Sequence, residues 1–135
     1  MTGGWDWSES GSTGYGEWIS SADRVRYLLD RPLSDTPGSR FAYNSAAVFL
    51  LGIVIEEAVD QSLEEWADDV LLGPMGIEAD WEPFSEGYVN AGSGIDLTPR
   101  DLARIGQLML QEGRSGDQTL VSEGWVTSAT RAHHE

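Results

Sequence analysis

The sequence predicts a mainly α-helical domain, and three observations support that prediction. The run from Ala46 to Ile55 holds no charged residue, which is typical of a helix buried on all sides. Thr98-Pro99 combines a good helix cap with a proline suited to the first helical position. The alternation of apolar and polar residues that marks a half-buried strand is scarce. We expect five helices, long aromatic loops, and short extended segments only at 41–43 and 120–121.

Composition limits the classes of function. The chain has 135 residues, enough for one domain, and a net charge of −15. That charge argues against binding to nucleic acid or to an anionic membrane surface. The longest apolar run is about ten residues, half of what a membrane-spanning helix needs. Cysteine is absent from the sequence, which excludes disulfides and thiolate chemistry, and all 8 basic residues are arginine.

The first segment, residues 1–16, is predicted to be irregular because glycine and serine interrupt regular structure. Trp5 and Trp7 lie within it, so the segment is either a mobile end or a loop that lines a cleft. A helix over residues 22–30 follows. Ser20 or Ser21 is the expected cap, and the residues before Pro32 end the helix.

The central helix is expected from Ser45 to about Asp60, followed by a second helix over 62–72. Gly52 lies inside the central helix at a cost in propensity, which predicts a close contact there. Ser62 and Glu65 have the spacing of a capping box at the start of the second helix. Gly73-Pro74 is expected to end that helix.

The second half of the chain begins with residues 78–97, which are predicted to be irregular. A helix from Thr98 to a positive-φ glycine at Gly113 follows, and residues 114–119 form a turn. The last helix covers about 123–131 with Ser122 as its cap. The residues expected to face inward on these two helices are Leu102, Ile105, Leu108, Met109, Trp125 and Val126.

The chemistry is expected at Tyr43-Asn44-Ser45, directly before the central helix. A tyrosine hydroxyl has an ordinary pKa near 10, so it needs nearby positive charge to act as a base near neutral pH. The N-terminus of the helix supplies partial positive charge. From these residues alone, the alternative is a buried tyrosine beside a capping serine.

Other candidate motifs are weaker. The sequence contains neither a G-x-S-x-G elbow nor a phosphate-binding loop with its lysine. The paired acids at 56–57, 64–65 and 68–69 lie on polar helix faces, as solvated surface residues do. His133-His134-Glu135 is not expected to bind metal, because adjacent side chains point in different directions.

Several stretches together resemble the serine β-lactamase-like family. Residues 37–77, PGSRFAYNSAAVFLLGIVIEEAVDQSLEEWADDVLLGPMGI, are similar to its P-G-x-x-F-x-Y-x-N/S motif, its apolar L-L-G helix and its P-L/M-G-M/I turn. Residues 92–126 are similar to its G-G/S-G, L-T-P-R-D-L-A-R/K-x-G and W-V segments, and MTGGWDW resembles its M-T-S-G-L-x-W loop. The family includes class C β-lactamases, DD-peptidases, carboxylesterases and 6-aminohexanoate-dimer hydrolases.

The resemblance implies a two-lobed fold, one lobe all-helical and one α/β, of which this chain would be mostly the helical lobe. It also implies acyl transfer: the serine of an S-x-x-K motif attacks a carbonyl, while the motif's lysine and the tyrosine of Y-x-N/S share proton transfer. Tyr43 matches that tyrosine, and Ser45 matches the third position, where asparagine is common. The implied partner is a small-molecule or peptide-like acyl substrate, with no metal or organic cofactor. The expected substrate contacts are Asn44, Trp5, Gly92 and Ser93.

The chain departs from the family pattern in having no lysine and therefore no S-x-x-K motif. In the family that motif precedes the M-T-S-G loop, and a third motif, K-T-G or H-x-G, follows the matched region. We therefore expect residues 1–135 to be a partial β-lactamase-like domain that is inactive alone. Two alternatives stay open: a catalytically inactive homologue serving as a binding or regulatory module, and a free-standing helical domain.

Overall fold

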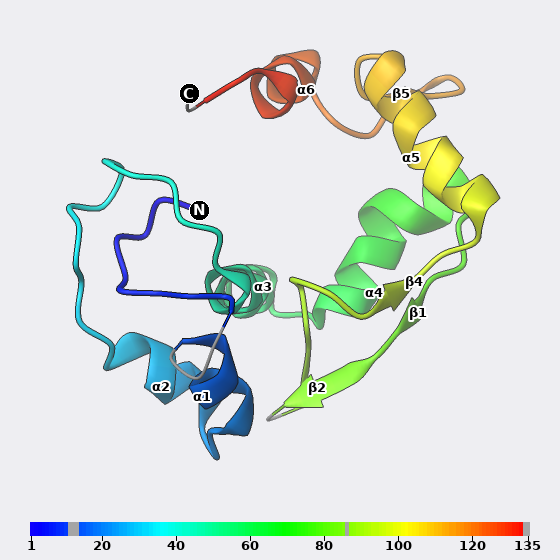
Figure 1. Ribbon diagram of the computed structural model, residues 1–135. Coiled ribbons are helices and arrows are strands. Elements are labelled where there is room, and N and C mark those ends of the chain that lie inside the picture. Colours follow the sequence, from blue (N-terminus) through cyan, green and yellow to red (C-terminus); the bar gives the residue numbers. More distant parts are fainter. Residues whose placement is uncertain (11–13, 86, 134–135) are drawn as a thin grey trace. The chain divides into compact units, whose positions relative to one another are not determined.

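The computed structural model describes residues 1–10, 14–85 and 87–133 (Figure 1). Over these residues the chain forms two compact units. The first joins Met1–Leu63 to Glu82–Gly94, and the second joins Glu64–Trp81 to Ile95–Glu135. Within the described ranges, no helix has the length and apolar character needed to cross a membrane.

The first unit is built around α1 (Tyr15–Ser20), α2 (Arg24–Leu29) and α3 (Ser45–Val59), and α1 and α2 both pack on α3. α2 begins where the Asp23 carboxylate accepts a hydrogen bond from the backbone N–H of Arg26 at 2.8 Å. The predicted cap at Ser20 or Ser21 is therefore wrong. Ser21 has extended backbone between the two helices, and α1 occupies part of the segment that was predicted to be irregular.

α3 begins at Ser45 and ends at Val59, as predicted, but it is not buried on all sides. Ala46, Phe49 and Gly52, three residues apart on one face, are buried. Leu51 and Val54 are 56% and 55% exposed, so the expectation of burial all round is wrong for this chain. The prediction for Gly52 is confirmed, because a Cβ there would lie 2.8 Å from the Cβ of Ala91.

An aromatic core holds the first unit together. Trp18 on α1 is fully buried, and its ring centroid lies 5.7 Å from that of Phe49 and 5.4 Å from that of Phe84. Residues distant in sequence therefore share one core, which buried and partly buried side chains surround. These are Trp5, Trp7, Tyr15, Ile19, Val25, Tyr27, Leu28, Ala46, Leu50, Ile53 and Tyr88.

Short strands replace the irregular segment predicted for 78–97. β2 (Pro83–Ser85) pairs with β3 (Tyr88–Val89), and β1 (Asp80–Trp81) pairs with β4 (Ile95–Asp96), both antiparallel. A third antiparallel pair, β5 (Arg114–Ser115) with β6 (Gln118–Thr119), forms at the predicted turn. Strands of two or three residues are too short to show an alternating pattern, so the sequence did not reveal them.

The second unit contains a run of consecutive helical segments, then α5 (Pro99–Leu110) and α6 (Glu123–Thr130). α4 (Leu63–Ala67) continues into a π-helical turn, η1 (Asp68–Leu72), and a 3-10 turn, η2 (Gly73–Met75). Gly76, with positive φ, ends this run, so Gly73-Pro74 does not stop it as predicted.

The predicted caps at the starts of α5 and α6 are confirmed, but α5 ends at Leu110 and not at Gly113 as predicted. Thr98 caps α5 by accepting from the Asp101 N–H at 3.2 Å, Ser122 caps α6, and Gly113 has φ of 87°. The inward faces are only partly as predicted: Leu102 is 63% exposed and Trp125 is 64% exposed. Leu108 and Val126 are buried. Leu102 and Leu108 lie about 120° apart around the helix, as six residues at 3.6 per turn require.

Asp101 in the first turn of α5 is a buried acid with two partners. Thr98 donates its hydroxyl to one carboxylate oxygen and Arg104 donates to the other, each at 2.5 Å. The hydrogen bond from Thr98, and then the charge and hydrogen bond of Arg104, hold the Asp101 pKa below its ordinary value. A lowered pKa means that the ionised form stabilises the fold, and this contribution is lost as the pH falls through the folded-state pKa.

Replacing Phe49 tests the aromatic core. Phe49→Ala is expected to lower the free energy of unfolding by about 3–5 kcal/mol, because it removes a buried ring and leaves a cavity. Leu51→Ala, on the exposed face of the same helix, is the matched control and should cost less than about 1 kcal/mol. Urea unfolding followed by circular dichroism measures both. Equal losses would show that α3 does not bury the Phe49 face.

The pH dependence of stability tests Asp101. Asp101→Asn should lower the urea midpoint at pH 7 relative to wild type, and this difference should shrink as the pH falls below about 4, where aspartate ordinarily protonates. Asp117→Asn, an exposed acid in the β5–β6 turn, is the control. A gap between wild type and Asp101→Asn that stays constant with pH would contradict the assigned interactions.

Candidate active site

Tyr43 lies directly before α3, and its side chain is 57% exposed. The preceding residue is held in place, since the Ala42 N–H donates to the Met1 carbonyl at 3.0 Å. Because Tyr43 is mostly exposed, the alternative of a buried tyrosine is excluded for this chain. The phenol is accessible beside the positive end of a 15-residue helix.

Asn44, expected as a substrate contact, is the N-cap of α3. It is 4% exposed, and its side-chain oxygen accepts from the Ala47 N–H at 2.9 Å. That oxygen satisfies one of the free amides at the start of the helix. The cap is thus Asn44 and not Ser45, and any contact between Asn44 and a substrate stays a prediction.

Ser45, the first residue of α3, is bound by a carboxylate from far away in the sequence. Its backbone N–H donates to Glu9 Oε1 at 2.5 Å, and its hydroxyl donates to Glu9 Oε2 at 3.1 Å. Trp7 Nε1 also donates to Glu9 Oε1, at 2.7 Å. We call Trp7, Glu9 and Ser45 the Glu9 clamp. It joins the first loop to the start of α3, where the helix dipole favours a negative charge.

Gly92 lies against the same turn of α3. A Cβ at this position would be 3.1 Å from the Ser45 carbonyl oxygen and 3.6 Å from the Val48 Cβ. Buried Asn90 shapes the loop: its oxygen accepts from the Gly92 N–H at 2.9 Å, and its nitrogen donates to the Ser93 hydroxyl at 2.9 Å. The structure therefore places Gly92 against the backbone of Ser45, and a substrate contact of Gly92 or Ser93 stays a prediction.

Trp5 is placed differently. It is partly buried against the aromatic core, and its backbone forms an isolated antiparallel bridge with Leu33. Its packing accounts for its presence in the first loop, and a substrate contact stays a prediction.

Glu9 and Asn90 were missed by sequence reasoning. Glu9 is 36 residues from Ser45, and no spacing pattern links a loop carboxylate to a distant helix start. Asn90 could have been suspected, because asparagine two residues before glycine often forms a side-chain turn.

Metal binding gains no support within the described ranges, where no group of three or more potential metal-ligating side chains occurs. His133 is exposed, and its Nε2 lies 2.6 Å from the Ser128 carbonyl oxygen. His134 and Glu135 lie outside the described residues.

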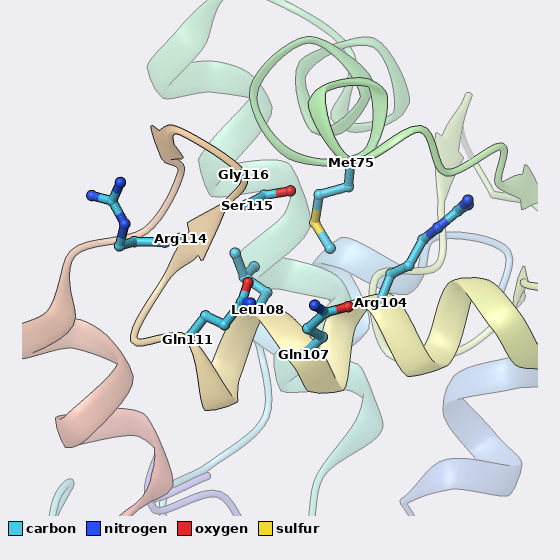
Figure 2. A pocket seen from close by; sticks show the side chains of 8 residues that line it. All are labelled: Met75, Arg104, Gln107, Leu108, Gln111, Arg114, Ser115 and Gly116. Carbon is cyan, nitrogen blue, oxygen red and sulfur yellow. The ribbon is translucent and has the colours of Figure 1, made fainter.

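A cavity of about 310 Å³ lies in the second unit, between α5, η2 and the β5–β6 pair (Figure 2). It contains none of the candidate residues. Its two guanidinium groups, those of Arg104 and Arg114, point away from each other in Figure 2. Arg104 is also engaged by the Gly76 carbonyl at 2.8 Å and by Asp101. This cavity is therefore not organised as an anion-binding site.

Comparison with known proteins agrees with the resemblance seen in the sequence. The chain is 31% identical over 90 residues to the 6-aminohexanoate-dimer hydrolase of Paenarthrobacter ureafaciens, covering 65% of this chain and 23% of that protein. A solved structure described as a beta-lactamase, from Bacteroides dorei DSM 17855, matches with a TM-score of 0.67 and 26% identity over 81% of this chain and 33% of its own.

The penicillin binding protein of Bacillus halodurans shares the fold, with a TM-score of 0.63 and 18% identity over 77% of this chain and 38% of its own. The chain thus spans about a quarter to two-fifths of the length of these relatives. The sequence model of the Beta-lactamase family matches residues 1–134, nearly the whole chain. The chain belongs to the beta-lactamase family.

Proposed function

We propose that this chain is the helical-lobe part of a serine hydrolase that acts on an amide, ester or β-lactam carbonyl, with Tyr43 as proton relay. The observation that carries the proposal is an exposed tyrosine at the N-terminus of α3, in a chain that belongs to the beta-lactamase family. Ser45 is the partner of Tyr43 in the Y-x-N/S motif, Gly92 lies against the Ser45 backbone, and Gly92 and Ser93 are proposed substrate contacts.

The proposed reaction is acyl transfer. A serine hydroxyl bonds to the carbonyl carbon, its proton passes to the Tyr43 oxygen, and the same oxygen returns a proton to the leaving group. Water then hydrolyses the acyl-enzyme. These steps need protein groups and water and require no cofactor.

The nucleophile is proposed to lie in another part of a longer protein. This chain has no lysine and so no S-x-x-K motif, and it spans 23% of the length of the 6-aminohexanoate-dimer hydrolase. A lone tyrosine lacks both the serine that forms the acyl-enzyme and the lysine that shares proton transfer with the tyrosine in the family. Residues 1–135 alone are therefore proposed to be inactive.

Tyr43→Phe in the full-length protein tests the relay. We expect kcat on a nitrophenyl ester and on a chromogenic β-lactam to fall about 10²–10⁴-fold, as loss of a general base does. Tyr27→Phe is the matched control, because its hydroxyl is engaged by Glu17 at 2.6 Å on α1. An unchanged rate in folded Tyr43→Phe would reject the relay and favour the catalytically inactive binding module.

A further inference from the structure

The Glu9 clamp fixes the direction of the three hydrogen bonds that Glu9 accepts from described residues. Oε1 accepts from the Trp7 indole and the Ser45 backbone N–H, and Oε2 accepts from the Ser45 hydroxyl. An ionised carboxylate is an acceptor only. The Ser45 hydroxyl must therefore be the donor in its bond to Glu9.

This direction limits what Ser45 can offer to a ligand. A serine hydroxyl has one proton and two acceptor lone pairs, and the proton is committed to Glu9. The backbone N–H of Ser45 is committed as well. What Ser45 still offers is an oxygen that accepts hydrogen bonds. An amide side chain, common at this position in the family, would offer both a donor and an acceptor.

We propose that Glu9 is a positioning residue that holds the Ser45 hydroxyl as a hydrogen-bond acceptor and so favours substrates with an N–H, secondary amides, over the corresponding esters. The inference rests on the proposed function, since it assumes that Ser45 contacts the substrate. Glu9 itself touches no reacting atom; it acts through Ser45. An ester places an oxygen where the amide has its N–H, and two facing acceptors gain no hydrogen bond.

A purely structural role for Glu9 makes a different prediction. If the clamp only ties the first loop to α3, its loss would affect stability and would lower activity on amides and esters alike. If the clamp orients the hydroxyl, its loss changes the preference between the two. The ratio of kcat/KM for a matched amide and ester separates these cases, because global damage to the site largely cancels in the ratio.

Glu9→Gln in the full-length protein is the decisive variant. Glutamine keeps the shape and one acceptor oxygen, but it places an NH2 donor where the carboxylate accepts. The Ser45 hydroxyl must then turn and become a donor toward the substrate. For a 4-nitroanilide and a 4-nitrophenyl ester of the same acyl group, we expect the amide-to-ester ratio of kcat/KM to fall about tenfold, mainly through KM.

Three further variants keep the inference falsifiable. Ser45→Ala removes the hydroxyl and leaves the Trp7–Glu9 bond in place, so it should lower the same ratio, and adding Glu9→Gln to it should change the ratio no further. Glu17→Gln changes a carboxylate that is bound by Tyr27 on α2 and should leave the ratio as in wild type.

The outcomes separate the two proposals. An unchanged amide-to-ester ratio in folded Glu9→Gln overturns the role of Glu9. The same holds if Glu9→Gln lowers the ratio equally with and without the Ser45 hydroxyl. Both conclusions stand even where Tyr43→Phe abolishes activity. An unchanged rate in Tyr43→Phe overturns the relay, whatever the ratio does. A fall in the ratio that disappears in the Ser45→Ala background supports the positioning role.

Discussion

The contact between Phe49 and Trp18, with ring centroids 5.7 Å apart, is the constraint on which the candidate site depends. Phe49 lies one turn into α3, so its burial against α1 fixes where that helix starts and which way its first turn faces. The positions of the residues at that first turn therefore depend on the packing of the aromatic core. Trp18 is the largest of the fully buried side chains among the described residues, and aromatic residues dominate the energetics of such cores.

The start of α3 must also satisfy its free backbone amides, and two side chains share this task. Asn44 accepts from the Ala47 N–H, as a helix cap does, and Glu9 accepts from the Ser45 N–H. The second interaction places a negative charge at the positive end of the helix, which is stabilising. Fold stability and site geometry are therefore coupled: the groups that complete the helix also orient Ser45 and leave Tyr43 accessible.

Features set by neighbouring residues were predictable from the sequence, and interactions between residues far apart in the sequence were not. The start of α3 at Ser45 and the caps at Thr98 and Ser122 followed from residues within one helical turn. Burial on all sides of α3 was wrong, because an apolar run shows that burial is favourable but not which neighbours are present to cover Leu51 and Val54. The bond between Glu9 and Ser45 joins residues 36 apart, and no local pattern encodes it.

The candidate chemistry was predictable to a similar extent. The motif around Tyr43, taken together with the matching stretches on either side of it, identified the family, and the structure shows Tyr43 exposed and its neighbour Asn44 buried as the cap of α3. The proposed acyl transfer uses the serine of an S-x-x-K motif, which this lysine-free sequence does not contain, so the residues described supply one side of the proposed site. Three sets of contacts hold that side in place, because the aromatic core, the Asn44 cap and the Glu9 clamp all act on the first turn of α3.

A crystal structure of the full-length protein with a bound boronic-acid acyl analogue tests the central claim most directly. In the tetrahedral adduct the serine oxygen is bonded to boron, and the two boron hydroxyls stand for the oxyanion and for the leaving group or hydrolytic water. The account predicts the Tyr43 hydroxyl within about 3.2 Å of a boronate oxygen, or joined to it by one water, with the Glu9 clamp intact. A Tyr43 hydroxyl beyond that reach, with another residue in hydrogen-bond contact at the leaving-group side, would contradict it.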